Sequence, residues 1–524
     1  MKLIVRINEG TLAGRAYELE TGFLTVGRSE TCTIRFDPNT ERIASKQHAF
    51  IEVKDDGFYV RDNQSTNGTY LNGQRVETAK LSEGDRIEFG QKGVAAYVHI
   101  EDSTSSPQHH RFEVVAAQEP RSVQQSFSNL ALGSAPAVKP EPSKTGRYIG
   151  IGVALCVILF LAFIVALITF ASVGVGTAIL AAIVAFIPAM LYLVPFMWLD
   201  RYDPEPVWLL ALAFAWGALV AVIFSFFANT ILEIGLMTAI DKNWGEVLGA
   251  VAVAPIFEEG SKGLGLVILL IFFRKYFDDI LDGIVFAGVI ALGFATVENV
   301  LYYGRAINKG GIFLLVLLFG LRGILGPFAH ATFTAMTGIG CGIARESHKT
   351  IVRILMPIFG YGAAVALHAT WNTLATFAVD IVDQLNIGWV CTELGMEQQG
   401  LCSYLITYTI LEVPLFFIFL FFALYVMRRQ GKIVREMLAL DIARGLIPEE
   451  HAKKTTSAFR SSGWVLGGIF SGKYWARTRY VRAVGKLGLS YWHIQRATAA
   501  QGQTASFQQN PILREEVLKW RDQV

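Results

Sequence analysis

Two carboxylates and an ammonium group lie within a five-residue segment of a long apolar stretch, as Glu258, Glu259 and Lys262. An ionisable side chain within a bilayer costs several kcal/mol, so such residues are functional candidates by default. Glu258 and Lys262 are four residues apart, which places them on one face of a helix, where they can pair. Glu259 then points about 100° away and is expected to leave a second carboxylate free. A structural ion pair therefore explains Lys262 and one Glu, but not the other.

The next three apolar stretches also carry polar side chains near their middles. Glu298 and Asn299 occur in "GFATVENVLYY", His330 in "PFAHATFTAMTG", and His368 and Asn372 in "ALHATWNT". A single His in a membrane helix is usually a packing hydrogen bonder. Four consecutive stretches with polar groups at similar depth instead predict one polar cavity inside a helical bundle.

Three kinds of chemistry fit this set of eight residues. Either Glu258 or Glu259 can activate a water molecule, with the other held by Lys262, while His and Asn side chains stabilise an oxyanion. Alternatively, a divalent metal such as Zn can be held by Glu and His, with Glu298, His330 and His368 as candidate ligands, and lower the pKa of a bound water. Both arrangements predict hydrolysis of a peptide bond in or near the membrane. The third possibility is a relay of protons or ions without hydrolysis.

Apolar stretches long enough to cross a bilayer recur after Gly146. Of the 524 residues, 52% are hydrophobic and only 17% are charged, a composition too apolar for an ordinary soluble protein. A span needs about 20 apolar residues to cross about 30 Å of hydrocarbon. Eight stretches are long enough: 148–170, 174–199, 207–232, 247–273, 280–303, 312–343, 354–379 and 404–427.

The distribution of Lys and Arg predicts the orientation of these spans. The expected inner loops contain Arg274, Lys275, Arg345 and Lys349, whereas the expected outer loop 380–401 contains neither Lys nor Arg. Basic residues concentrate in cytoplasmic loops. The pattern predicts a multi-pass protein of the plasma membrane with both termini in the cytoplasm.

The five cysteines form no CxxC pair, which disfavours zinc-ribbon and thioredoxin-like chemistry. Cys391 and Cys402 lie in or beside the outer loop 380–401. A disulfide can persist outside the cytoplasm, so these two residues are expected either to form one or to remain two free thiols.

Residues 1–101 have a different pattern, in which short runs such as "KLIVRI" alternate apolar and polar residues between turn signals. This pattern predicts an all-β sandwich. Residues 102–146 are rich in Ser, Gln, Pro and Ala and are predicted to form a flexible linker. A phosphate group requires a guanidinium, hydroxyls and amide donors on converging loops. Five residues of predicted loops supply them: Arg28, Ser45, Lys46, Thr66 and Asn67.

The segments "VGRSE", "SKQH" and "STNGTYLNG", in this order and spacing, resemble the forkhead-associated (FHA) domain. FHA domains bind phosphothreonine peptides. The resemblance implies that Arg28 and Ser45 hold the phosphate and that Asn67 binds the peptide backbone, with Thr66 and Lys46 in support. It also implies that His48 braces the Ser45 loop.

The segments "EEGSK", "FATVEN", "HATFTAMTG" and "HATWN" follow one another in this order, preceded by "LDRYDPEPVWLL". With these motifs, the region from about Leu199 to Asn372 resembles the PrsW family of intramembrane proteases, which is distantly similar to the CAAX prenyl endopeptidases. The family implies proteolysis of membrane substrates, such as bacterial anti-sigma factors, by a metal-dependent or a glutamate–His mechanism. The CAAX enzymes have His in their second motif, where this chain has Glu298 and Asn299.

Residues 147–430 are therefore predicted to form a membrane protease domain, and residues 431–524 a basic cytoplasmic helical tail. No Asp or Glu occurs from His451 to Thr498. That segment is expected either to lie on the inner leaflet or to be a solvated helix of a small domain. The net charge of +2 is unevenly placed, and no nucleic-acid partner is expected.

The sequence thus predicts an intramembrane endopeptidase whose FHA module recruits a phosphorylated substrate or adaptor. The rival hypothesis is a non-catalytic scaffold, or an ion or proton pathway, that recruits phosphorylated partners. The ordered motifs favour the protease, because a relay has no need for EExxK followed by FxxxEN.

Overall fold

The structure is a computed structural model that describes residues 2–19, 23–29, 32–54, 56–101, 144–347, 349–393, 396, 399–499 and 506–524. Most of the predicted linker 102–146 lies outside these described residues. The chain forms two compact units. The first comprises residues 1–150, 439–444 and 491–507, and the second comprises residues 151–438, 445–490 and 508–524.

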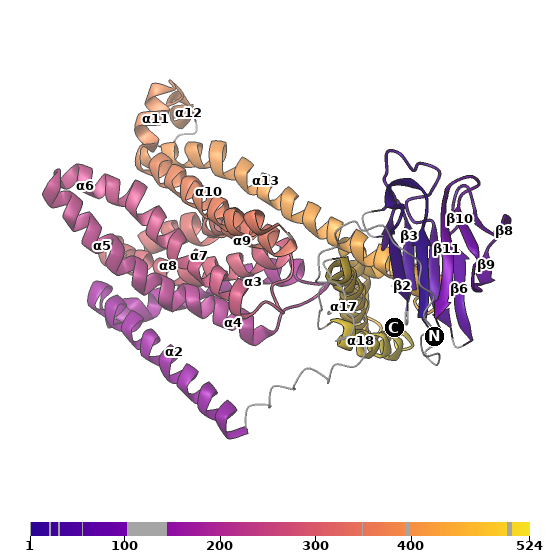
Figure 1. The fold of residues 1–524 in the computed structure, drawn as a ribbon. Helices are drawn as coiled ribbons and strands as arrows, with labels where there is room; N and C mark the ends of the chain where they lie inside the picture. The colour runs from indigo at the N-terminus through magenta and orange to yellow at the C-terminus, as the bar shows by residue number, and fades with distance from the viewer. Residues whose placement is uncertain are drawn as a thin grey trace. The chain divides into compact units, whose positions relative to one another are not determined.

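The N-terminal part of the first unit is a sandwich of two β-sheets, which confirms the predicted fold (Figure 1). One sheet has the order β2-β1-β11-β10-β7-β8 and the other has the order β4-β3-β5-β6-β9. The strands are β1 (Lys2–Ile7), β2 (Ala16–Leu19), β3 (Phe23–Gly27), β4 (Ile34–Arg35), β5 (Ala49–Lys54), β6 (Gly57–Asp62), β7 (Thr69–Leu71), β8 (Gln74–Val76), β9 (Thr78–Lys80), β10 (Arg86–Phe89) and β11 (Val94–Glu101).

The alternation read from the sequence corresponds to the two faces of these strands. In β1, Leu3, Val5 and Ile7 are fully buried between the sheets, because successive side chains of a strand point to opposite faces. β1 pairs antiparallel with β11, and Val5 lies opposite Val98. The apolar core between the sheets holds the loops of the two sheet ends in place.

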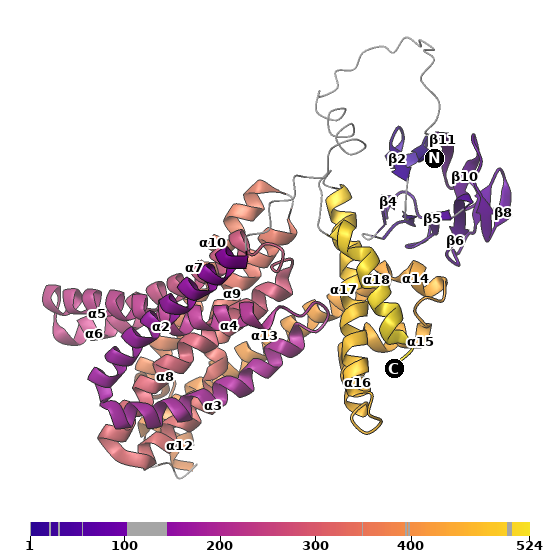
Figure 2. The same ribbon diagram turned by 90° about the horizontal axis from the view of Figure 1, so that it is seen from below.

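Helices dominate the described residues from Lys144 onward (Figure 2). They are α2 (Lys144–Val173), α3 (Val175–Leu199), α4 (Val207–Ala215), η2 (Trp216–Ala221), α5 (Val222–Ala239), α6 (Lys242–Leu248), η3 (Gly249–Val253), α7 (Ala254–Phe272), α8 (Ile280–Leu318), η4 (Phe319–Leu325), α9 (Pro327–Glu346), α10 (Thr350–Thr376), α11 (Ala378–Gln384), α12 (Trp389–Glu393), α13 (Gln399–Met437), α14 (Ala439–Ala443), α15 (Glu449–Thr455), α16 (Ala458–Gly467), α17 (Tyr474–Ala499) and α18 (Ser506–Arg521). The segments η2, η3 and η4 are π-helical.

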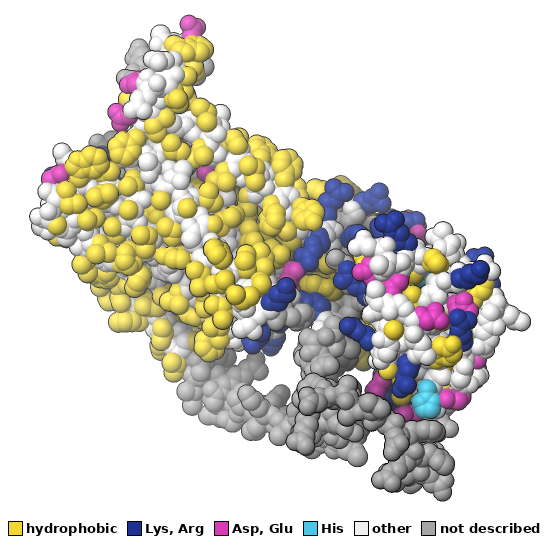
Figure 3. All heavy atoms as spheres, turned by 45° about the horizontal axis from the view of Figure 1, so that its top comes forward, with side chains coloured by type: hydrophobic (Ala, Val, Ile, Leu, Met, Phe, Trp, Pro, Cys, Tyr) yellow, Lys and Arg dark blue, Asp and Glu magenta, His cyan; other side chains and the backbone are white. Residues whose placement is uncertain are grey.

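Six helical stretches of the described chain are long and apolar enough to cross a membrane. They are 152–173, 175–199, 207–239, 280–346, 350–376 and 400–437. The predicted count of eight is not confirmed, because the stretch 280–346 runs through both α8 and α9, and α7 carries three charged residues. Hydrophobic side chains gather over the long helices in the space-filling view (Figure 3), as expected for a multi-pass membrane protein.

Helix α8 is the buried centre of the second unit, and nearly all its residues from Leu281 to Val300 are buried. Small residues allow its neighbours to approach closely. A Cβ atom on Gly283 would lie 2.1 Å from the Gly338 carbonyl oxygen of α9, and one on Gly293 would lie 2.1 Å from the Phe214 carbonyl oxygen of α4. This close packing fixes the position of Glu298 and Asn299 relative to α9.

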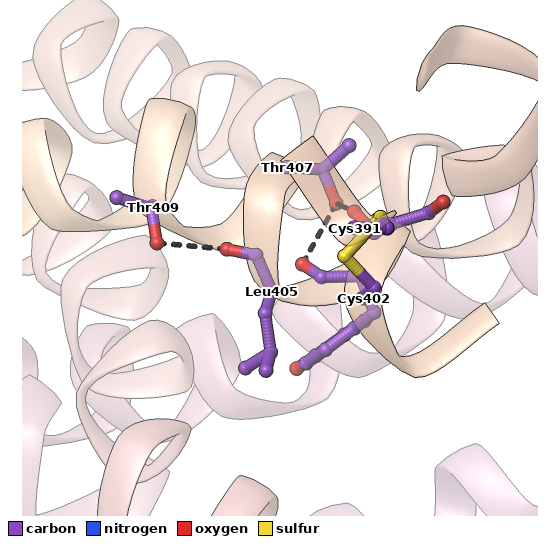
Figure 4. Close-up of a disulfide and its surroundings, with 7 residues drawn as sticks. Cys391, Cys402, Leu405, Thr407 and Thr409 are labelled. Atoms are coloured by element: carbon purple, nitrogen blue, oxygen red, sulfur yellow. Dashed lines mark hydrogen bonds between the residues drawn. A yellow bond between two sulfur atoms is a disulfide. The ribbon is translucent and has the colours of Figure 1, made fainter. Parts of the chain in front are cut away.

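Cys391 of α12 and Cys402 of α13 form a disulfide (Figure 4). Of the two states expected from the sequence, the structure therefore has the oxidised one. The bond ties the short helix α12 to the start of α13, five residues before Thr407.

Candidate active site and phosphate-binding loops

Glu259 of α7 is the more tightly held of the two adjacent carboxylates. Its Oε1 lies 2.9 Å from Lys262 Nζ and 3.1 Å from His368 Nδ1 of α10. Thr334 of α9 donates a hydrogen bond of 2.8 Å to its Oε2. Glu259 and Lys262 are both fully buried, so each compensates the charge of the other. Of the two carboxylates that Lys262 could hold, the structure therefore has Glu259 as the more tightly held one.

Glu258 is held more loosely, although it is also buried. Lys262 Nζ is 3.7 Å from its Oε2, and Asn229 of α5 donates a long hydrogen bond of 3.3 Å to its Oε1. Among the described residues, its Oε2 has no hydrogen-bond partner. His368 Nε2 lies 4.0 Å from that oxygen. The helical spacing allows Lys262 to pair with either Glu. The contacts of Thr334 and His368 with Glu259 hold that carboxylate where Lys262 pairs with it more closely.

Glu298 of α8 is paired with an arginine that the sequence analysis did not identify. Arg322 Nη2, on η4, lies 2.9 Å from Glu298 Oε2, and its Nε donates a 2.9 Å hydrogen bond to Asn299 Oδ1. Its guanidinium carbon is 3.8 Å from the centre of the Tyr302 ring, a cation–π arrangement. The sequence feature that could have identified this residue is the occurrence of an Arg inside the apolar stretch "GLRGILGPF".

His330 of α9 lies between Glu298 of α8 and the charged cluster of α7. Its Nε2 lies 3.0 Å from Glu298 Oε2, and its Nδ1 lies 3.4 Å from Lys262 Nζ. The His330 and His368 rings have centres 5.2 Å apart. The structure thus brings six of the eight predicted residues into direct contact with one another, from four helices.

The other two predicted residues, Asn299 and Asn372, line an adjoining cavity of about 310 Å³. Asn372 is turned toward η3, where its Nδ2 donates a 2.8 Å hydrogen bond to the Ala250 carbonyl. The cavity is bordered by polar and aromatic side chains, among them Tyr302, Arg322, His330, Trp371 and Tyr404. A polar cavity beside the cluster is the arrangement that the four polar stretches predicted.

Three side chains of the cluster could hold a metal ion. Glu258, His330 and His368 each offer one ligand atom, and these atoms lie within 4.8 Å of one another. The set differs from the predicted ligands in one member, because Glu258 takes the place of Glu298. Glu298 lies between Arg322 and His330 instead.

In the β-sandwich, the five predicted phosphate-binding residues lie on three neighbouring loops. The Arg28 backbone N–H donates to the Ser45 carbonyl, which joins the β3–β4 and β4–β5 loops. The Thr66 backbone N–H donates a 3.0 Å hydrogen bond to Ser45 Oγ, which joins the β6–β7 loop. Asn67 Nδ2 donates to the Ile43 carbonyl. Lys46, Thr66 and Asn67 are exposed, as a peptide-binding surface requires.

The buried side chain of His48 connects two of these loops. Its Nδ1 accepts a 2.9 Å hydrogen bond from the Ser45 N–H, and its Nε2 lies 3.1 Å from the Gly68 carbonyl oxygen, to which it can donate. Burial lowers the pKa of His48, which favours the neutral ring that this pattern needs. The bracing role implied for His48 agrees with these contacts.

Comparison with known families separates the chain into the same two parts. Residues 205–398 match the family model described as "PrsW family intramembrane metalloprotease". Residues 24–90 match the FHA domain. The chain thus has one region similar to the FHA domain and one similar to the PrsW family. The region that matches the PrsW model contains all eight predicted site residues of the membrane unit, and the region that matches the FHA model contains all five predicted phosphate-binding residues.

Individual relatives match one part or the other. Protease PrsW of Clostridioides difficile is 33% identical over 142 residues, which is 26% of this chain and 55% of that protein. Glycogen accumulation regulator GarA of Mycobacterium tuberculosis is 32% identical over 85 residues, which is 16% of this chain and 51% of that protein. This chain thus spans about half the length of these two curated relatives. A solved structure, "Structural and functional analysis of phosphothreonine-dependent FHA domain interactions", is 25% identical, covers 20% of this chain and 99% of its own, and has a TM-score of 0.17.

Proposed function

We propose that the membrane unit hydrolyses peptide bonds of membrane-protein substrates within or close to the bilayer. The observation that carries the proposal is the convergence of α7, α8, α9 and α10 on one buried polar cluster beside a cavity in an apolar bundle. Ionisable side chains are energetically costly in a membrane, so a cluster of them indicates a functional site. An ion or proton pathway is the less supported function, because two of the three carboxylates are neutralised by Lys262 and Arg322.

The distribution of charge assigns the roles. Lys262 lies closest to Glu259 and Arg322 pairs with Glu298, which leaves Glu258, at 3.7 Å from Lys262, as the least compensated of the three carboxylates. Glu258 is therefore the general base that removes a proton from the attacking water. Glu259 positions His368 through its Nδ1, and Glu298 positions His330 through its Nε2. Asn299 and Asn372, which border the cavity, are candidates to donate hydrogen bonds to the developing oxyanion.

A divalent metal such as Zn fits the same residues. Glu258, His330 and His368 form a carboxylate-and-imidazole donor set of the kind that zinc prefers, and Glu258 Oε2 is a buried oxygen in need of a partner. When bound, the ion would lower the pKa of a water molecule and polarise the scissile carbonyl. In that case Glu258 is a ligand, and the positioning roles of Glu259 and Glu298 are unchanged.

We expect the purified full-length protein to retain about one equivalent of a divalent metal, as a three-ligand catalytic site would. His368→Ala should remove most of it, as measured by elemental analysis after gel filtration. The matched control is His99→Ala, because His99 is an exposed histidine of the FHA domain. Metal-free protein that cleaves its substrate at the full rate would instead establish the glutamate–His mechanism.

The experiment that tests proteolysis itself compares cells that express the intact protein with cells that express Glu258→Gln. New N-termini of membrane proteins, quantified by mass spectrometry, should appear only with the intact protein. The inactive variant should also co-purify with uncleaved substrate. Identical sets of N-termini in the two cell lines would refute the protease.

We further propose that the protein is located in a bacterial plasma membrane with both termini in the cytoplasm, and that its substrates are signalling proteins such as anti-sigma factors. The FHA domain would recruit a phosphothreonine-containing substrate or adaptor. The loops that carry Arg28, Ser45 and Thr66 support this role, because their guanidinium, hydroxyl and amide groups suit a phosphate.

Arg28→Ala should weaken binding of a phosphothreonine peptide by roughly tenfold to over a hundredfold, since a charge-assisted hydrogen bond contributes about 1.5–3 kcal/mol. Isothermal titration with phosphorylated and unphosphorylated peptides measures the effect. The control is Arg15→Ala, an exposed arginine that precedes β2 and lies outside the three loops. If recruitment is the role, Arg28→Ala also slows cleavage of a full-length phosphorylated substrate and spares a short membrane peptide. Equal slowing of both substrates would contradict recruitment.

A further inference from the structure

The tail carries an exposed apolar surface that the proposed protease does not use. It consists of Phe459 and Leu466 on α16, Ile469 and Phe470 in the following turn, and Trp475 at the start of α17. These side chains are between 56% and 95% exposed, and Phe470 is the most exposed of them. Single exposed apolar residues are ordinary, whereas five within one helix-turn-helix segment indicate an interaction surface. We call this set the α16 surface.

The α16 surface is not a remnant of an incomplete core. Further along α17, Tyr480, Val484 and Leu487 are almost completely buried and form the interior of the tail. On α16 itself, Ala458 and Ser461 are buried, so the helix has one packed face and one apolar exposed face. The sequence left lipid contact open for the whole basic segment, but five of its large apolar residues are buried and cannot reach lipid: Tyr480, Val481, Val484, Leu487 and Leu489.

The α16 surface adjoins the end of a membrane span. Trp198, one residue before the end of α3, has its ring 5.5 Å from the Phe459 ring, centre to centre. Its Nε1 donates a 2.8 Å hydrogen bond to Ser462 Oγ, to which Arg201 also donates. Trp and Arg at the end of a span mark the boundary between hydrocarbon and headgroups. Helix α16 is therefore held at that boundary.

Basic side chains accompany the apolar ones. Arg460 and Lys473 are exposed beside Phe459 and the turn, and Arg479 follows on α17. No acidic residue occurs between His451 and Thr498 to offset them. A leaflet of anionic lipids attracts such a segment through its negative surface potential and accepts apolar side chains into its upper acyl region. A soluble partner protein would need a matching acidic and apolar surface. The position of the α16 surface beside Trp198, at the end of a membrane span, favours lipid over such a partner.

We propose that the α16 surface inserts into the headgroup region of the anionic leaflet next to α3 and anchors the tail to the membrane. Phe459, Leu466, Ile469, Phe470 and Trp475 enter the lipid, while Arg460 and Lys473 contact lipid phosphates. The proposal does not depend on proteolysis, and it follows from continuity between the end of a span and an exposed apolar helix.

The test uses full-length protein in nanodiscs of phosphatidylcholine and phosphatidylglycerol. Exposed Cys156 is replaced by Ala, while Cys32 and Cys341 are buried and the remaining cysteines form the disulfide. A nitroxide is attached through Ser471→Cys, next to Phe470, or through Lys453→Cys on α15 as the solvent control. Collision of the label with oxygen reports lipid, and collision with a water-soluble nickel complex reports solvent.

The Ser471 label should be accessible to oxygen and shielded from nickel, and the Lys453 label should show the reverse. Ile469→Asp with Phe470→Asp should return the Ser471 label to solvent, while Ile469→Leu with Phe470→Leu should leave it in lipid. The Lys453 label, unchanged in every variant, verifies the fold of the tail. A nickel-accessible Ser471 label in the unmodified surface overturns the proposal, as does shielding that survives the two Asp substitutions, which would indicate a second copy or another protein.

Discussion

Glu258→Gln should lower the rate of substrate cleavage by at least about a hundredfold, because general-base catalysis typically contributes 10²–10⁴-fold. Gln is nearly isosteric with Glu, but its amide cannot accept the proton of the attacking water and is a poor metal ligand. The variant should remain folded, because Glu258 Oε2 has no hydrogen bond to lose among the described residues. Cleavage of a membrane substrate in proteoliposomes, followed by mass spectrometry, measures the rate.

Two further substitutions make this result specific to Glu258. Glu412→Gln changes another buried carboxyl of the bundle, whose two oxygens have no partner among the described residues, and should retain activity. Glu259→Gln removes the charge that Lys262 and His368 face, and should therefore lower the thermal stability of the protein as well as its activity. An active Glu258→Gln together with an inactive but stable Glu259→Gln would reverse the assignment of the base.

The fold could be predicted where the repeat of apolar residues along the sequence determines which side chains are buried. The alternation in β1 places Leu3, Val5 and Ile7 in the core whatever the rest of the chain does. Apolar length identified the membrane helices similarly, but not their number. The helix interruption at Gly310 and Gly311 falls between the stretches 280–303 and 312–343, which the polar residues Arg305, Asn308 and Lys309 separate in the sequence.

The residues that meet in the buried polar cluster could be predicted, but not the partner that each one contacts. Polar residues in an apolar bundle must converge to be satisfied, and this requirement brought Glu258, His330 and His368 together. Which carboxylate Lys262 compensates depends on Thr334 and His368, which come from helices far away in sequence. Helical spacing within α7 alone therefore left open which of Glu258 and Glu259 is held by Lys262.

Arg322 is the residue for which sequence reasoning was least informative, and its replacement should have the second largest effect. Arg322→Gln leaves the mostly buried carboxylate of Glu298 without its cationic partner. Removing one partner of a buried ion pair typically costs about 3–5 kcal/mol, because the remaining charge is uncompensated. The substitution also removes the donor to Asn299 Oδ1. We therefore expect a clear loss of thermal stability in detergent and a loss of cleavage, since Glu298 no longer positions His330 correctly.

The double variant separates charge compensation from other roles of Arg322. Glu298→Gln with Arg322→Gln replaces the pair by two neutral amides, so most of the stability should return while cleavage stays low. The control is Lys453→Gln, because Lys453 and Glu449 form an exposed pair at 2.7 Å on α15, and exposed pairs typically contribute only about 0–1 kcal/mol. If the double variant is as unstable as Arg322→Gln, the uncompensated charge on Glu298 is not the cause, and the contacts of Arg322 with Tyr302 and Asn299 must supply the stability instead. If Arg322→Gln cleaves normally, the positioning of His330 through Glu298 is wrong, and His330 must be held by Lys262 and the packing of α9 alone.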